Sequence, residues 1–213
     1  LKELAKLTPQ DVRAFMAARR SEGTGSRSLM RSLAGVRSFA RFLEKNGKGK
    51  VAALSAVRAP KVPKTLPKPI AIGAAQRIGD ADLRAGEDRE PWVLARDAAV
   101  LALCYGSGLR ISEALGLTRG DFAGKVDAVT VTGKGRKQRM VPVLPQVAKL
   151  VAEYIKACPY DLPADGPLFL GARGGPLNPR LIARAMEEAR LALGLPATAT
   201  PHALRHSFAT HLL

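Results

Sequence analysis

The chain has 213 residues, of which 46% are hydrophobic, and 34 Lys and Arg against 18 Asp and Glu give it a formal net charge of +16. This composition is sufficient for one or two globular cores, and the excess positive charge indicates a polyanionic partner, with nucleic acid as the leading candidate. A membrane partner is disfavoured, because no apolar run approaches the roughly 20 residues of a spanning helix. Cys104 and Cys158 form no CxxC pair and no signal peptide is recognisable, so we expect a cytoplasmic, nucleoid-associated protein without a zinc site.

Two helices are predicted in the N-terminal region. Thr8 as N-cap and Pro9 at the first helical position predict a helix over TPQDVRAFMAARR, and SRSLMRSLAGVRSFARFLEKNG predicts a second helix that ends at Gly47. One face of the second helix is an apolar stripe formed by Leu29, Leu33, Val36, Ala40 and Leu43. The opposite face contains Arg27, Arg31, Arg37 and Arg41. We predict that this basic face contacts DNA phosphates, with an ordinary solvated surface as the alternative.

The segment RAPKVPKTLPKPI is predicted to be an extended linker. Its prolines at positions 60, 63, 67 and 69 are incompatible with a helix. Lys61, Lys64 and Lys68 make the segment cationic, so we predict that it follows a DNA backbone, although a merely soluble linker has a similar composition. The predicted organisation is a helical DNA-binding domain over residues 1–57, a linker over 58–69 and a second domain over 70–213.

The second domain mixes helical and strand patterns. The stretch PWVLARDAAVLALCYGSGLRISEALGL predicts a strongly apolar helix, a Gly-Ser-Gly break and a short helix that starts near Leu109. The stretch VDAVTVTGKGRKQRMVPV alternates on both sides of a Gly-Lys-Gly turn, which predicts a β-hairpin, and we predict that its Arg136 and Arg139 contact DNA. Two more helices are predicted, over LPQVAKLVAEYIKAC and over NPRLIARAMEEARLALG. The predicted fold is therefore mainly α-helical with one small antiparallel β-sheet.

Several common enzyme motifs do not occur in the sequence, which contains no GxxxxGK[ST] loop, no HExxH and no GxSxG. The acidic stretch GDADLRAGEDRE has no recognisable metal-ligand spacing and is interpreted as a solvated loop. What remains is a set of basic groups near turns and in one short motif. Arg110 follows the Gly-Ser-Gly break, Lys134 is at the tip of the predicted hairpin, and His202 and Arg205 are one helical turn apart. They suit a phosphodiester, because guanidiniums bind its nonbridging oxygens while an imidazole and an ammonium move protons.

Four motifs in a fixed order carry a resemblance to a known family. GSGLRISEALGL, GKGRKQRMVPV, LFLGARGGPLN and HALRHSFATHLL closely resemble the catalytic domain of the Xer-type tyrosine recombinases, and the N-terminal RSLAGVRSFARFLEKNG resembles the same group. The resemblance implies that Arg110 and Arg205 are catalytic arginines, that His202 is the HxxR histidine, that Lys134 protonates the leaving 5′-oxygen and that Glu113 supports these basic groups. For His206 and His211 we expect structural roles.

The same resemblance places the nucleophilic tyrosine, and a further His or Trp, downstream of the HxxR motif. Tyr105, Tyr154 and Tyr160 all precede His202, and Tyr105 is expected to serve in packing. We therefore expect the sequence to be a fragment, incomplete at both ends, that binds DNA without cleaving it. The expected fold is a helical core-binding domain followed by a mixed α/β catalytic domain, which in the complete enzyme form a clamp around DNA.

For the complete enzyme the resemblance implies DNA cleavage and rejoining through a 3′-phosphotyrosyl intermediate, with neither a metal nor another cofactor. The implied substrate is a double-stranded recombination site at which chromosome dimers are resolved. The implied partners are a XerD-like sister recombinase, in a heterotetramer on DNA, and a septal DNA translocase. The alternatives are a DNA-binding module without catalysis, a decayed recombinase paralogue, and a phage or mobile-element integrase.

Overall fold

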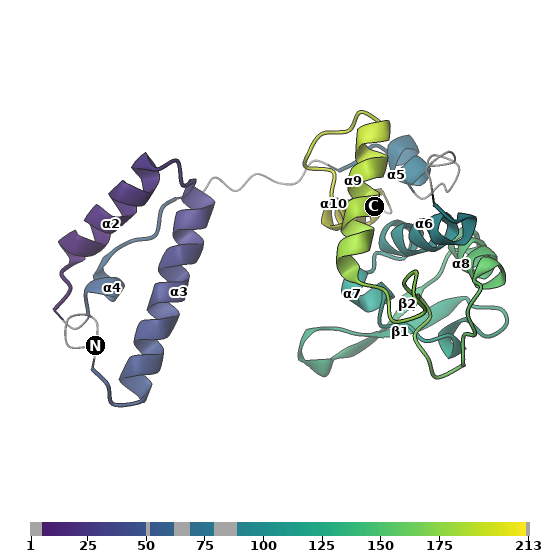
Figure 1. Cartoon of the computed structure of the whole chain (residues 1–213), viewed down its shortest axis with the longest axis horizontal. Helices are drawn as coiled ribbons and strands as arrows, with labels where there is room; N and C mark the ends of the chain where they lie inside the picture. The colour runs from purple at the N-terminus through teal and green to yellow at the C-terminus, as the bar shows by residue number, and fades with distance from the viewer. Residues whose placement is uncertain (1–5, 50–51, 62–68, 79–88, 212–213) are drawn as a thin grey trace. The chain divides into compact units, whose positions relative to one another are not determined.

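The computed structural model describes residues 6–49, 52–61, 69–78 and 89–211, together with the backbone but not the side chain of Lys134. The chain forms two compact units, residues 1–66 and 67–213 (Figure 1), and the division falls inside the predicted linker. Within the described ranges, no helix combines the length and apolar character that crossing a membrane requires.

The N-terminal unit contains helices α2 (Pro9–Ser21), α3 (Ser26–Lys45) and the short α4 (Ala53–Ala56). Thr8 caps α2 as predicted: its Oγ1 accepts a hydrogen bond from the Asp11 amide at 3.2 Å, and the Asp11 carboxylate accepts one from the Thr8 amide at 2.8 Å. Of the apolar stripe predicted on α3, four residues are buried and Val36 is exposed. Leu33 and Ala40 pack in this unit's core with Leu54 of α4.

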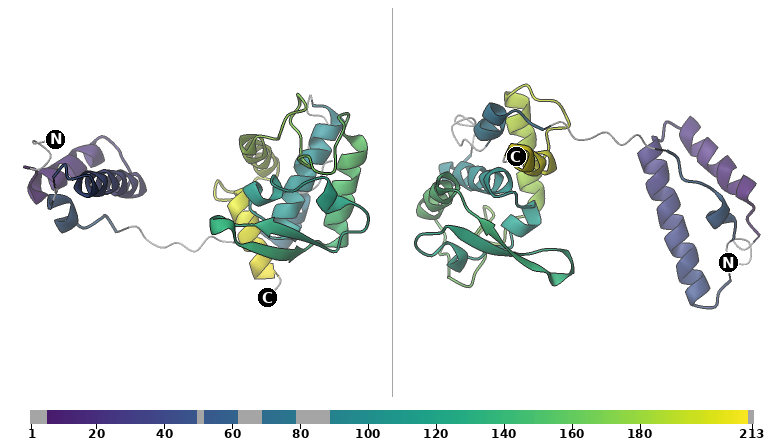
Figure 2. Two further views of the ribbon diagram at one scale, coloured as in Figure 1. Left: turned by 90° about the horizontal axis from the view of Figure 1, so that it is seen from below. Right: turned by 180° about the vertical axis from the view of Figure 1, so that it is seen from behind.

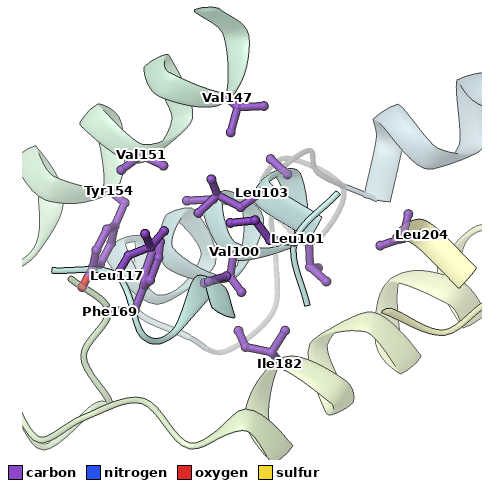
Figure 3. Close-up of a cluster of buried hydrophobic side chains, with 14 of the residues drawn as sticks. Val100, Leu101, Leu103, Leu117, Val147, Val151, Tyr154, Phe169, Ile182 and Leu204 are labelled. Atoms are coloured by element: carbon purple, nitrogen blue, oxygen red, sulfur yellow. The ribbon is translucent and has the colours of Figure 1, made fainter. Parts of the chain in front are cut away.

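The C-terminal unit is built around α6 (Pro91–Gly106), which is buried along most of its length. Helices α5 (Ile72–Ile78), α8 (Pro145–Ala157), α9 (Pro179–Ala192) and α10 (Pro201–His211) pack against α6 (Figures 1 and 2). Figure 3 shows the resulting core, in which Leu103 lies among side chains of the neighbouring helices and Tyr154 stacks on Phe169. Because α6 is mostly apolar, and its buried Arg96 is paired with Asp97, it can be covered in this way along most of its length.

A two-stranded antiparallel sheet lies in the same unit, formed by β1 (Ala128–Thr132) and β2 (Gln138–Pro142). The strands are joined by a turn over Lys134–Arg136, in which Gly135 and Arg136 have φ angles of 77° and 59°. In the register Val129 pairs with Val141 and Val131 pairs with Arg139. The predicted hairpin is confirmed, as is the mainly helical fold with one small antiparallel sheet. Short 3₁₀ turns and the helix α7 (Ile111–Ala114) connect these elements.

Candidate active site

The Gly-Ser-Gly break sets the position of Arg110. Gly108 has a φ of 61°, and a Cβ at this position would lie 2.6 Å from the ring of Phe208 on α10, so both its backbone conformation and its surroundings require glycine. The next residue, Leu109, is buried, and Arg110 is the N-cap of α7. The side chain of Arg110 remains 53% exposed. The turn therefore anchors the backbone in the core and leaves the guanidinium accessible.

Glu113 on α7 lies at the centre of the cluster, and its side chain is only 3% exposed. Its carboxylate accepts hydrogen bonds from the Arg110 amide at 2.9 Å and from Arg110 Nη1 at 2.7 Å. Arg205 Nη1 on α10 donates to the same group at 3.2 Å. Arg139 on β2 donates through both terminal nitrogens, at 2.9 and 2.8 Å. One buried carboxylate thus joins three guanidiniums that come from three different elements.

These contacts fix the charge of the cluster. The hydrogen bonds from Arg139, followed by those from Arg110, lower the pKa of Glu113 to about 2, although burial opposes the shift. The same contact with Glu113 raises the pKa of Arg139. Burial, together with the charge of Arg110, lowers the pKa of Arg205 from its high ordinary value. Near neutral pH the carboxylate is therefore ionised, and three guanidiniums around one carboxylate leave the cluster with an excess of positive charge.

Arg110 and Arg205 retain unused hydrogen-bond donors. Each side chain donates to Glu113 through Nη1 alone, whereas a guanidinium has five N–H groups. In the part of the chain that the structure describes, the other N–H groups of these two side chains have no protein acceptor. Two charged donors held on one rigid anchor are suited to bind the nonbridging oxygens of a phosphodiester.

Helix α10 carries the HxxR motif. It is fixed through Ser207, whose buried hydroxyl donates to Ala203 O at 2.8 Å and accepts a hydrogen bond from the Ile70 amide at 2.8 Å. His202 is exposed one turn before His206, and their Nε2 atoms are 2.9 Å apart, in a hydrogen bond. Partial desolvation of its ring lowers the pKa of His202, and the charges of His206, Arg205 and Arg110 lower it further. A neutral imidazole is therefore present beside the arginines at neutral pH.

The three tyrosines have hydrogen-bond partners outside this cluster. The buried Tyr154 hydroxyl donates to Leu168 O and accepts from the Leu170 amide, both at 3.1 Å. Tyr160 donates to Ala172 O at 2.7 Å. The Tyr105 hydroxyl lies 3.0 Å from Nδ1 of His211, so His211 contacts a packing residue of α6 as expected.

The residues predicted to contact DNA differ in how the fold places them. Arg27, Arg31 and Arg41 lie exposed on α3, and Lys61 and Arg136 are exposed as well. Arg37 differs from the prediction, because its guanidinium is turned inward and donates to the backbone carbonyls of Leu54 and Val57. Lys64, Lys68 and the side chain of Lys134 lie outside the described residues.

Arg139 also differs from its predicted role as a DNA contact, since both of its terminal nitrogens bind Glu113. The alternation of residues along the strand could have predicted this inward position of Arg139. Arg139 is two residues before Val141 and four before Val143, and both valines are buried. The alternation of a strand therefore places Arg139 on the apolar face, where a charged side chain requires a partner.

Comparison with known proteins identifies two family models along the chain. Residues 91–213 match the model of the phage integrase family, and residues 1–47 match the phage integrase N-terminal SAM-like domain. A tyrosine recombinase XerC of Bradyrhizobium diazoefficiens is 67% identical over 100% of this chain and 67% of its own length. One of Nitrobacter winogradskyi is 65% identical with the same coverage. The chain thus spans about two thirds of the length of these relatives.

Solved structures show the same fold at low sequence identity. The XerH site-specific recombinase bound to a palindromic difH substrate superposes with a TM-score of 0.74 at 19% identity, over 97% of this chain and 62% of that one. A lambda integrase dimer bound to a COC' core site gives a TM-score of 0.67 at 18% identity, over 96% and 73% of the two chains.

Proposed function

Because this chain belongs to the phage integrase family and is a tyrosine site-specific recombinase, we propose that the arginine cluster around Glu113 is the phosphate-binding part of its active site. The observation that carries this proposal is the convergence of Arg110 and Arg205 on one buried carboxylate. They are 95 positions apart in the sequence. Both keep N–H groups available for a diester, which is the arrangement needed to stabilise a pentacoordinate phosphorus.

In the proposed reaction a tyrosine hydroxyl attacks the phosphorus of a DNA phosphodiester, and the bond from phosphorus to the 5′-oxygen breaks. His202 takes up the tyrosine proton, and Lys134 gives a proton to the leaving 5′-oxygen. Arg110 and Arg205 oppose the negative charge that develops on the nonbridging oxygens. The 5′-hydroxyl of a partner strand then attacks the phosphorus of the 3′-phosphotyrosyl ester and gives its proton to Lys134, while the tyrosine leaves and recovers its proton from His202. One phosphoester bond replaces another in each step, so no external energy source is required.

The biological substrate is proposed from the similarity to XerC proteins. We propose a double-stranded recombination site used to resolve chromosome dimers in the nucleoid, with a XerD-like sister recombinase in a heterotetramer and a septal DNA translocase as partners. The exposed arginines of α3, together with Arg136 and the linker lysines, are proposed to bind the DNA backbone.

A suicide substrate tests the catalytic assignment. The intact recombinase is incubated with a labelled duplex that carries its recombination site and a nick next to the scissile phosphate, in the presence of EDTA. We expect a protein-linked 3′ end on a denaturing gel, and we expect EDTA to leave its yield unchanged, because guanidiniums supply the positive charge. A yield that depends on added divalent cation would contradict the proposed mechanism.

A second candidate function, DNA binding without cleavage, applies to the 213-residue polypeptide and is favoured by the engagement of its three tyrosine hydroxyls elsewhere. We expect this polypeptide to bind the nicked duplex without becoming covalently attached to it. A protein-linked band that disappears in Tyr105→Phe, Tyr154→Phe or Tyr160→Phe would instead assign the nucleophile to that tyrosine.

A further inference from the structure

Arg139 occupies an inward-facing position of the hairpin. It pairs with the buried Val131 across the sheet, and residues that pair directly across two antiparallel strands point to the same face. The next residue, Met140, points to the other face and is 75% exposed. Strand geometry therefore directs the Arg139 side chain toward the interior of the domain.

Its contact with Glu113 is the most complete that a side chain makes in the cluster, where the Arg110 amide is a further donor to the same carboxylate. Arg139 donates one N–H to each carboxylate oxygen, at 2.9 and 2.8 Å, whereas Arg110 and Arg205 each use one side-chain nitrogen. A parallel pair of hydrogen bonds fixes the plane of a carboxylate, which single bonds do not. The orientation of Glu113 is therefore set from two elements, by Arg110 at the start of α7 and by Arg139 on the hairpin.

The ion pair also lies beside the turn that bears Lys134. A Cβ at Gly133 would lie 3.4 Å from Arg139 Nη1 and 3.7 Å from Glu113 Oε1. The amide of Gly133 donates to Lys137 O at 2.8 Å and so begins the turn. The backbone immediately before Lys134 thus lies about one side-chain atom away from the two charged groups.

We propose that Arg139 is a positioning residue that fixes the Glu113 carboxylate and joins the Lys134 hairpin to Arg110 and Arg205. This inference rests on the function proposed above, because it assigns Lys134 as the proton donor. When Arg139 is absent, the turn loses the charged group beside which it lies, so the backbone that carries Lys134 is no longer held in place relative to the arginines.

The chemistry of the leaving group provides the test. The intact recombinase is assayed on two nicked duplexes, one with the natural 5′-oxygen at the scissile phosphate and one with sulfur in its place. A thiolate leaves without receiving a proton, so the sulfur substrate bypasses the proton donor. Lys134→Ala serves as the reference variant. Lys137→Gln is the matched control, since it removes one positive charge from the same hairpin at an exposed position.

We expect Arg139→Gln to slow cleavage of the oxygen substrate by about 100-fold or more, as for loss of a general acid. The sulfur substrate should recover most of the lost cleavage rate in Arg139→Gln, as we expect for Lys134→Ala. Lys137→Gln should cleave both substrates at the normal rate. Arg139→Lys keeps the charge but not the two-pronged contact, so it should behave like Arg139→Gln. If the sulfur substrate restores the cleavage rate of Lys134→Ala but not that of Arg139→Gln, the positioning role is overturned. If Lys134→Ala itself is not restored, the proton-donor assignment of the proposed function fails.

A measurement on the 213-residue polypeptide is independent of activity. Amide hydrogen exchange at Gly133 should become faster in Arg139→Gln and should remain unchanged in Lys137→Gln, at equal thermal stability of the C-terminal unit. The side-chain pKa of Glu113, followed by carboxyl NMR, should rise in Arg139→Gln alone. Unchanged exchange and an unchanged pKa would show that Arg139 does not couple the hairpin to Glu113. A parallel loss of DNA affinity without either change would assign Arg139 to DNA contact instead.

Discussion

The arginines of α3 and the arginines around Glu113 show two uses of the same side chain. Arg27, Arg31 and Arg41 lie exposed along one helix surface, where counterions screen their charge and each side chain can adopt many conformations. Arg110 and Arg205 are held on a carboxylate that is 3% exposed. The first arrangement is suited to salt-dependent affinity for a polyanion, and the second to stabilising charge that develops at one phosphorus atom. The number of arginines is similar in the two regions. Their expected roles differ because the fold holds the guanidiniums around Glu113 in place and leaves those on α3 exposed to solvent.

The largest expected effect separates these two uses. Arg205→Ala or Arg110→Ala in the intact recombinase should reduce the rate of DNA cleavage by about 100- to 1,000-fold or more, because each removes a preorganised charge. Binding of the recombination site should change little in comparison. Cleavage of a nicked substrate and a gel-shift titration under the same buffer conditions measure the two quantities. A variant that cleaves normally would remove its arginine from the site.

Replacing Glu113, the carboxylate that binds the three arginines, should change the stability of the C-terminal unit in a pH-dependent way. The pKa of Glu113 in the folded chain is about 2, against an ordinary value of 4.5, so its ion pairs stabilise the C-terminal unit above about pH 4.5, and this contribution is lost as the pH falls toward 2. Glu113→Gln should therefore lower the melting temperature at neutral pH and remove that part of the acid dependence. Thermal melts between pH 7 and pH 3 measure it. Equal acid sensitivity of the two proteins would contradict the prediction.

The exposed arginines should behave differently, with a smaller effect on affinity that depends on salt. Each of Arg27→Gln, Arg31→Gln and Arg41→Gln should reduce the steepness of log K against log salt by about 0.9 if that side chain neutralises one phosphate. Titrations at several salt concentrations with the 213-residue polypeptide give the slopes. Arg37→Gln provides the contrast: it should lower the stability of the N-terminal unit, because Arg37 binds the carbonyls of Leu54 and Val57, and should leave the slope nearly unchanged.

The smallest expected effect concerns the two histidines of α10. His206 contributes to the lowered pKa of His202, so His206→Gln should raise the pKa of His202. The chain contains only three histidines, which makes the imidazole NMR signals readily assignable. His211→Gln is the control, since His211 pairs with Tyr105. An unchanged pKa of His202 in His206→Gln would show that the contact between the two rings does not influence its charge.

Much of the fold could be predicted from local patterns. Thr8 followed by Pro9 identifies the start of α2, and the alternation around Gly-Lys-Gly identifies the hairpin, because capping and strand periodicity depend on residues close in the sequence. The structure brings Arg110, Glu113 and Arg205, singled out from their motifs, into one cluster. Their catalytic roles stay predictions for the experiments above.

The sequence by itself determined the order of the elements, the basic character of the protein and the residues from which a phosphate-binding site can be built. Only the tertiary structure decided which arginines serve the fold. Arg37 and Arg41 lie on the same predicted helix face, and only Arg37 has turned to bind backbone carbonyls around α4. Arg139 reaches a carboxylate 26 positions away in the sequence. A guanidinium is carried on a long, flexible side chain, so its partner depends on which groups the fold brings within its reach, and no local pattern contains that information.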